Sequence, residues 1–255
     1  MAKYFDEKVW SQALQKPDWY LRLFGDYQRL MRLADENPSG VAESIKEEVY
    51  RFLEERLMQG MVALASDGPN RDAERKAIDT VVVHHTKNPS GITWQRLSVM
   101  HLIRLYAPYY RQPSSEEGKI AGQAIYSHHF RNGQPVFYAY HWLVRMDGQT
   151  ERLLNDHEIG WQAGDWDINC RSMALCLDND FTYQAPSEKV LQAIADLINR
   201  HYRQVTGERI LGHREVNQKT TCPGNMFLTG WKEVLLQKVQ EAHRGGDLTE
   251  RHGAR

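Results

Sequence analysis

The sequence has few cysteines, no long apolar run and almost no net charge. Its three cysteines are Cys170, Cys176 and Cys222. A small, odd number does not make a disulfide framework, so we expect a reducing compartment. No stretch approaches the roughly 20 apolar residues that cross a bilayer. The formal charge of −1 gives no electrostatic indication of nucleic acid or membrane binding, and neither is predicted as a partner.

The first residues also lack the apolar core of a secretory signal peptide, because charged side chains interrupt them from Lys3 onward. We therefore expect a cytoplasmic protein, with export by another route left open. Internal repeats and low-complexity tracts are absent too. What the chain does have is an ordinary globular composition, with 41% hydrophobic and 25% charged residues over 255 positions. That length suits one large domain, or a main domain with a smaller companion.

The first 70 residues are predicted to form an N-terminal helical segment. Apolar residues recur at three- and four-residue spacings over 18–36 and again over 41–64. The breaker residues at 37–40 separate the two helices, and those at 67–70 end the second. We expect their apolar faces to pack against each other or a neighbouring domain. A surface for a partner or for the cell wall is the alternative.

The pattern changes after residue 70, where strands alternate with helices. Strands are predicted at 80–83, 136–146, 151–154, 172–177 and 209–211, and helices at 93–106, 188–205 and 227–242. The segment 108–133 is loop-rich and is a candidate lid or groove wall. We predict one domain over 76–243, followed by a frayed polar tail at 244–255.

Two segments far apart in the chain carry residues suited to zinc. Gly212-His213-Arg214-Glu215-Val216 is followed by Thr220-Thr221-Cys222-Pro223-Gly224, and Val83-His84-His85-Thr86 lies upstream. Together they offer two imidazoles and one thiolate at predicted strand ends and in a loop. Three protein ligands leave the fourth tetrahedral position for water, which is the arrangement of catalytic rather than structural zinc.

The residues around these ligands resemble a known family. Val-His-His-Thr is followed in order by three further blocks, Tyr140–Gly148, Gly160–Gly164 and Asn169–Leu175. With Gly-His-Arg-Glu-Val and Thr-Thr-Cys-Pro-Gly, they resemble the peptidoglycan amidase family. That family includes phage lysozyme-type N-acetylmuramoyl-L-alanine amidases and peptidoglycan recognition proteins. The resemblance covers about residues 78–242 and is specific because the blocks occur in this order.

The resemblance implies an α/β fold with a mixed central sheet flanked by helices. It also implies zinc-dependent hydrolysis of the bond between N-acetylmuramic acid and L-alanine, in peptidoglycan or muropeptides. Carried over position by position, the metal ligands are His84, His213 and Cys222. The catalytic tyrosine of the family falls on Tyr140, and the side chain two residues before the cysteine falls on Thr220. Oligomeric state is not implied.

Tyr140 and Thr220 would supply or position hydrogen bonds to the oxyanion of the reaction, each worth roughly 10²–10³ in rate. Strand alternation would put Tyr138 on the same face as Tyr140, so either tyrosine is a candidate. The position in the motif favours Tyr140. Glu215 could assist proton transfer, but an ion pair with a nearby arginine is the more common role of such a residue.

Substrate contacts are predicted for Trp161, Gln162 and Asn169, because aromatic faces and amides suit glycans and peptides. Trp166 is a further candidate for such a contact. Core packing is the alternative for Trp161 and for Trp166. Gln162 stands where many relatives have a histidine. We expect His85 and His141 to be buried structural residues rather than ligands.

Two further functions remain open at this point. One is a module that binds peptidoglycan without cleaving it, although relatives that have lost catalysis typically lack the cysteine or the first histidine. The other is an amidase acting on a different amide.

Overall fold

The computed structural model describes residues 4–37, 40–114 and 118–252, the side chains of 245–252 excepted. It divides into two compact units. The first joins the chain up to Asn70 with Thr93–Phe137, and the second joins Arg71–Ile92 with the chain from Tyr138 onward. The domain predicted at 76–243 therefore includes a segment, 93–137, that belongs to the first unit.

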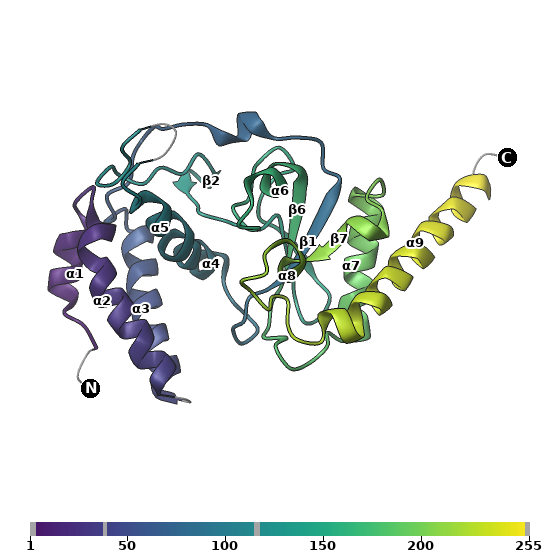
Figure 1. Ribbon diagram of the computed structural model, residues 1–255, viewed down its shortest axis with the longest axis horizontal. Helices are drawn as coiled ribbons and strands as arrows, with labels where there is room; N and C mark the ends of the chain where they lie inside the picture. The colour runs from purple at the N-terminus through teal and green to yellow at the C-terminus, as the bar shows by residue number, and fades with distance from the viewer. Residues whose placement is uncertain (1–3, 38–39, 115–117, 253–255) are drawn as a thin grey trace. The chain divides into compact units, whose positions relative to one another are not determined.

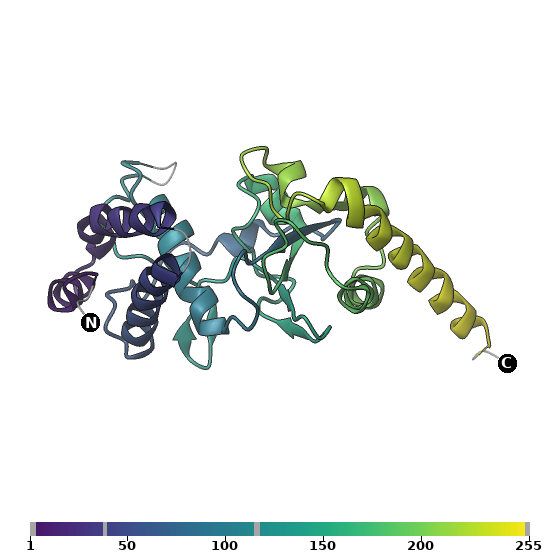
Figure 2. The same ribbon diagram turned by 90° about the horizontal axis from the view of Figure 1, so that it is seen from below.

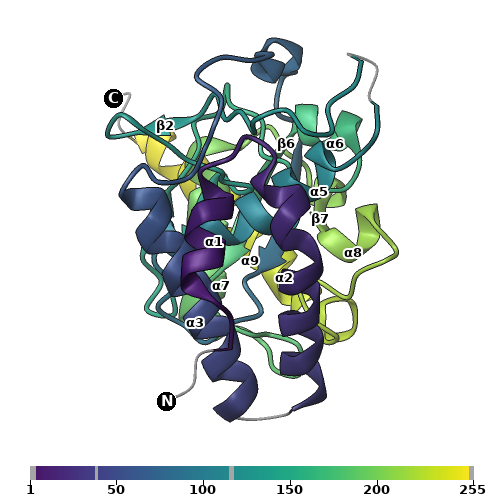
Figure 3. The same cartoon turned by 90° about the vertical axis from the view of Figure 1, so that its left-hand side faces the viewer.

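The first unit is mainly helical, as expected of its first 70 residues. Its helices are α1 (Glu7–Leu14), α2 (Trp19–Glu36), α3 (Gly40–Met58), α4 (Trp94–His101), the π-helical turn η2 (Leu102–Tyr106) and α5 (Ala107–Tyr110). A short antiparallel hairpin, β2 (Phe130–Arg131) with β3 (Gln134–Pro135), lies in the loop-rich segment. Figure 3 shows α1, α2 and α3 within this unit. Pro38 and Ser39 of the predicted break, and Ser115 of the loop, lie outside the described residues.

Helix α3 is shorter than the predicted span of 41–64. It ends at Met58 because Gly60 takes a left-handed conformation, with φ +68°. The amide of Gly60 then bonds to the carbonyl of Leu57, and that of Met61 to Arg56. This hydrogen-bond pattern closes a helix at its carboxyl end.

The apolar faces of α2 and α3 are buried within the first unit. Tyr27 of α2 and Tyr50 of α3 share a hydrogen bond of 3.0 Å between their hydroxyls. The guanidinium of Arg104 donates to Tyr50 at 2.9 Å. Buried positions on the two helices include Leu23, Leu30, Ala34, Ile45, Val49, Phe52 and Leu53.

The second unit is built on a five-stranded sheet in the order β5-β4-β6-β1-β7. Figure 1 labels β6, β1 and β7 of this sheet. Its strands are β1 (Thr80–His85), β4 (Trp142–Val144), β5 (Thr150–Arg152), β6 (Ser172–Leu177) and β7 (Ile210–Gly212). Strand β5 is antiparallel to β4, whereas β4, β6, β1 and β7 run parallel. The predicted α/β class with a mixed sheet flanked by helices is confirmed.

The second unit also contains helices and short helical turns, which lie before, between and after the strands in the chain. They are η1 (Arg71–Glu74), α6 (Trp166–Arg171), α7 (Glu188–His201), η3 (Gly207–Arg209), α8 (His213–Val216), η4 (Phe227–Trp231) and α9 (Lys232–His252). Helix α9 runs to His252, so helical backbone continues through most of the segment predicted as a polar tail. Residues 253–255 lie outside the described part.

The strand predicted over 136–146 is reduced to Trp142–Val144. Pairing with β6 begins only where the amide of His141 reaches the carbonyl of Ala174, at 2.9 Å. Residues up to Phe137 belong to the first unit and have no neighbour in this sheet.

The two faces of the sheet have different surroundings. Side chains alternate along a strand, and Val81, Val83, Met173 and Leu175 belong to one buried cluster with α7 and α9. Helices α7 and α9 lie against each other in Figures 1 and 2. On the opposite face, β1 presents Val82 and His84, and β6 presents Ala174 and Cys176. Small side chains there leave room for residues arriving from loops.

Within the described ranges, no helix combines the length and the apolar character that crossing a bilayer requires.

His141 joins β4 to β6 and gives the fold a pH dependence. Its Nδ1 accepts the Ala174 amide at 3.1 Å, and its Nε2 lies 3.0 Å from the Glu158 carbonyl. Burial, reinforced by the nearby positive charge of Arg75, lowers the pKa of His141 to about 3. The ring is therefore neutral in the folded protein.

We predict that His141 makes the protein less stable as the pH falls from about 6.5 toward 4.5. The unfolded chain takes up a proton at His141 near pH 6.5 whereas the folded protein does not, so its contribution falls by up to about 1.4 kcal/mol per pH unit. Urea unfolding at several pH values measures this slope. A His141→Gln variant should be less stable at neutral pH and show a slope smaller by about one proton. Equal slopes would contradict the prediction.

Candidate metal centre

His84 lies near the carboxyl end of β1, on the face of the sheet away from α7 and α9. It is 1% exposed and sits opposite Cys176 in the parallel register. On its other side β1 pairs with β7, with Val83 opposite Gly212. Because parallel strands bring their carboxyl ends to the same edge, whatever follows β7 emerges beside His84.

His213 is that next residue, at the start of α8. Its ring centroid lies 4.6 Å from that of His84. The turn is held by Glu215, which accepts from the Gly212 amide at 2.8 Å and pairs with Lys232 at 2.7 Å. The ion pair expected for Glu215 is thus made, but with a lysine rather than an arginine.

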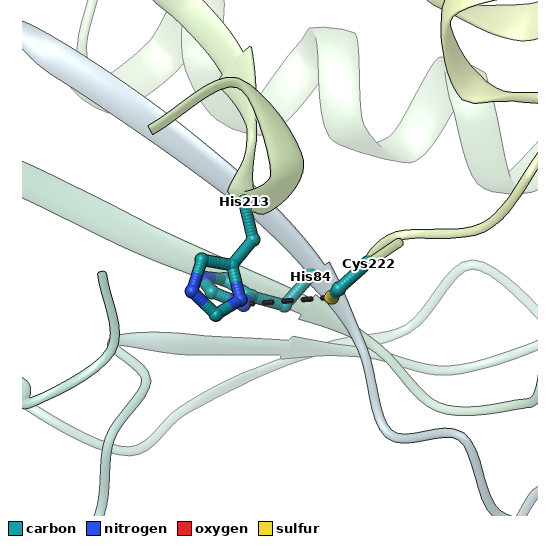
Figure 4. Close-up of side chains that lie close together, drawn as sticks. All are labelled: His84, His213 and Cys222. Carbon is teal, nitrogen blue, oxygen red and sulfur yellow. Dashed lines mark hydrogen bonds between the residues drawn. The ribbon is translucent and has the colours of Figure 1, made fainter. Parts of the chain in front are cut away.

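Cys222 reaches the two imidazoles from the loop after α8. Its sulfur lies 3.7 Å from Nδ1 of His84 and accepts the backbone N–H of His85 at 3.4 Å. Its carbonyl accepts the amide of Arg214 at 2.8 Å, which ties the loop back to α8. Figure 4 shows the three side chains converging from the strand, the helix start and the loop.

The donor set fits a tetrahedral zinc ion. One ligand atom from each of His84, His213 and Cys222 lies within 4.8 Å of the other two. Zinc–nitrogen and zinc–sulfur bonds of about 2.0 and 2.3 Å at a tetrahedral angle separate nitrogen from sulfur by about 3.5 Å. The observed 3.7 Å between Sγ and Nδ1 agrees with that separation. Across the described residues, no fourth histidine, cysteine or carboxylate joins the group.

Burial disfavours the charged forms of two of these donors, Cys222 and His213. It raises the pKa of the Cys222 thiol to about 12, opposed by the hydrogen bond from the His85 amide. Burial also lowers the pKa of His213, opposed by a backbone interaction with Ala163. A neutral imidazole is the form that binds a metal, whereas the thiol has to lose its proton on binding.

Tyr140 lies beside the centre. Its ring centroid is 5.0 Å from that of His84, and the residue is half-buried. Its hydroxyl forms a hydrogen bond with the thiol of Cys176. Burial raises the pKa of that thiol well above its usual value. Tyr138, the alternative, is fully buried. The chain at both residues lies outside the strand, so strand alternation does not relate them.

Thr220 contacts the backbone of the loop that carries Cys222. Its hydroxyl oxygen accepts the Cys222 amide at 3.1 Å, and the side chain is half-buried. This contact leaves the hydroxyl proton for another acceptor. Thr220, Tyr140 and His213 are all partly exposed, so solvent reaches the centre from their side.

Gln162 lies against His84 and is buried. Its side-chain oxygen is 2.6 Å from Nε2 of His84, and its amide nitrogen donates to the Ser172 hydroxyl at 2.8 Å. Asn169 supports the same loop, because its Oδ1 accepts the amides of Gln162 at 3.1 Å and Ala163 at 2.8 Å. Sequence patterns did not indicate Ser172 or Cys176 as neighbours of the centre, since only the strand register reveals them.

Trp161 and Trp166 lie edge to face, 6.3 Å between centroids, and both are half-buried. The guanidinium of Arg71 is 5.9 Å from the first ring and 5.6 Å from the second. Trp166 also donates to Glu74 at 2.7 Å. The pair therefore forms an aromatic surface next to Gln162, supported from η1.

His85 and His141 serve the fold, as expected. Nδ1 of His85 accepts the amide of Phe181 at 2.9 Å, and burial lowers the pKa of His85 to about 4. His141 holds β4 as described above. His157 is exposed.

Gly212 allows the cysteine loop to approach α8. A Cβ at this position would meet the Phe227 ring at 2.5 Å and Pro223 at 2.9 Å. We predict that Gly212→Ala displaces the loop and lowers the free energy of unfolding by about 1–3 kcal/mol. It should also speed the labelling of Cys222 by a thiol reagent, measured by mass spectrometry, because Cys222 is only 9% exposed.

Gly207→Ala is the matched control, since a Cβ there meets only Leu236, at an ordinary 3.6 Å. Its labelling rate should equal that of the wild type. If Cys222 reacted no faster in Gly212→Ala than in the wild type, the close packing of Gly212 against Phe227 and Pro223 would not be what holds the loop.

Solved structures to which the chain is similar include that of an N-acetylmuramoyl-L-alanine amidase, LysC from Clostridium intestinale URNW. It is 20% identical, with a TM-score of 0.46 over 70% of this chain and 95% of that one. An AmpD derivative is 18% identical, with a TM-score of 0.42 over 70% and 91% of the two chains. Drosophila peptidoglycan recognition protein SD is 21% identical, with a TM-score of 0.36 over 64% and 83%. Comparison with curated proteins finds no match.

Structural similarity at these identities and TM-scores gives no information about activity. The family model described as N-acetylmuramoyl-L-alanine amidase, however, matches residues 74–225. The matched range spans more than half of the 255 residues and contains His84, His213 and Cys222. The chain belongs to the N-acetylmuramoyl-L-alanine amidase family.

Proposed function

We propose that the protein is a zinc-dependent amidase that hydrolyses the bond between N-acetylmuramic acid and L-alanine in peptidoglycan or muropeptides. The observation that carries the proposal is the convergence of His84, His213 and Cys222, with donor atoms within 4.8 Å of one another. Membership of the amidase family supports the choice of substrate. Zinc at these residues would act as a Lewis acid toward the scissile amide carbonyl.

The number of donors favours catalysis over a structural role. Structural zinc sites are closed by four protein ligands, whereas catalytic sites use three. In the part of the chain that the structure describes, the group has three members. His213 is only half-buried, which would give a substrate access to the remaining position.

Tyr140 and Thr220 are the residues proposed to act on the substrate. Each has a hydroxyl near the ligands, and each is half-buried. We assign the Tyr140 hydroxyl to the oxyanion that forms at the lactyl carbonyl, since a donor there lowers the barrier. Thr220, whose oxygen already accepts the Cys222 amide, would donate its own proton on the same side.

Trp161 is proposed to contact the glycan or peptide. Its half-exposed ring, next to Trp166, offers the flat apolar face that sugar rings stack on. Gln162 and Asn169 are 6% exposed, so any substrate contact they make would come through the loop that they hold.

The direct test is hydrolysis of defined muropeptides with and without a chelator, read by mass spectrometry. We predict release of the free stem peptide, lost with the chelator and restored by zinc. Cys222→Ser should lower zinc content from about one ion per chain to near zero and abolish release. Cys170→Ser, which changes a buried cysteine outside the centre, should keep both.

The outcomes separate the alternatives. Muropeptides that bind but stay intact would identify a recognition module. No binding or cleavage of muropeptides, with hydrolysis of another amide, would identify a different substrate. Full zinc and activity in Cys222→Ser would show that the assigned ligand is wrong.

Tyr140→Phe tests the assignment of the hydroxyl. Since the change removes one hydrogen-bond donor and keeps the ring, we predict a fall in kcat of about 10²–10³ with zinc content unchanged. Tyr138→Phe is the matched control and should retain kcat. A Tyr140→Phe enzyme with normal kcat, or an equal loss in both variants, would remove Tyr140 from the mechanism.

A further inference from the structure

A buried amide contacts the candidate metal centre from the side opposite to the cysteine. The Gln162 side chain is 6% exposed, and its oxygen lies 2.6 Å from Nε2 of His84. Its amide nitrogen donates to the hydroxyl of Ser172, itself fully buried, at 2.8 Å. Gln162 therefore joins the ligand histidine to the start of β6.

The two ring nitrogens of His84 have different partners. Nδ1 lies 3.7 Å from the Cys222 sulfur, and Nε2 faces Gln162. A neutral imidazole carries its proton on one nitrogen only, and a nitrogen that binds a metal must be without it. If Nδ1 is the ligand atom, the proton belongs on Nε2 and needs a buried acceptor there. The side-chain oxygen of Gln162 is that acceptor.

The orientation of the amide decides which tautomer forms. With the oxygen toward His84, Nε2 donates and Nδ1 is left bare. With the amide nitrogen toward His84, Nε2 would have to accept, the proton would move to Nδ1, and the ligand atom would be blocked. The backbone is fixed in either case, because Asn169 accepts the amides of both Gln162 and Ala163.

We propose that Gln162 is a positioning residue, whose side-chain oxygen holds the His84 ring with its proton on Nε2 and Nδ1 turned to the metal. This inference rests on the proposed function. It gives Gln162 a task on the ligand instead of direct contact with the substrate. Partners of this kind orient metal ligands, and their loss typically costs 10–100-fold in metal affinity.

Nitrogen-15 NMR of the histidine rings in the full-length, metal-free protein tests the tautomer without any enzyme assay. The His84 signals are assigned by their absence in a His84→Asn variant. We expect a wild-type ring protonated at Nε2, and a mixture of tautomers in Gln162→Met, which keeps the side-chain length but cannot accept. A wild-type ring protonated at Nδ1 would overturn the inference.

Zinc affinity, measured by competition with a chelating dye, is the second readout. Gln162→Met should bind zinc about 10–100-fold more weakly than the wild type. Gln162→Glu is the matched control, because a carboxylate retains the acceptor, and it should bind zinc at least as tightly as the wild type. Thermal unfolding of each variant reports folding, and the wild-type tautomer decides the question if Gln162→Met does not fold.

The two proposals fail in different ways. A wild-type protein that does not bind zinc overturns the proposed function. A wild type that binds zinc, with Gln162→Met binding it equally tightly, overturns only the positioning role of Gln162.

Discussion

The parallel pairing of β1 with β7 is the constraint on which the candidate centre depends. Val83 lies opposite Gly212, so His84 and His213 leave the two strands at the same edge with their rings 4.6 Å apart. A slip of one residue in β1 would turn His84 toward the cluster under α7 and α9, because side chains alternate. The apolar packing that fixes this register thereby also fixes the two imidazoles.

Other residues of the sheet unit complete the centre, and they differ in how deeply they are buried. Strand β1 supplies the His84 imidazole and the start of α8 that of His213. The loop after α8 supplies the sulfur, held by the His85 amide and by the close approach of Gly212 to Phe227. Gln162 contacts the buried side of His84, whereas Tyr140 and Thr220 lie toward solvent. The order runs from a buried interior to a partly exposed edge, which is the arrangement that the proposed function requires.

Much of this arrangement could be predicted from the sequence, because ordered motifs and strand patterns are local signals. The strand at 172–177 and the mixed sheet are confirmed, and the structure brings together the three residues predicted as ligands. Contacts that depend on register were not predictable: Cys176 beside Tyr140, and Ser172 beneath Gln162. The early end of α3 depends on the left-handed conformation of Gly60, which periodicity does not reveal. The prediction of one strand over 136–146 is wrong, because residues 136–137 belong to the helical unit and only Trp142–Val144 form a strand of the sheet.

The chain passes between its two units three times, after Asn70, after Ile92 and after Phe137. The segment 93–137 thus leaves the sheet unit and returns to it, so both of its ends are covalently attached to that unit. When the helical unit unfolds alone, this segment remains a tethered loop with fewer conformations than a free chain, and the entropy gained is smaller. Covalent topology by itself therefore biases the helical unit toward its folded state for as long as the sheet unit stays intact.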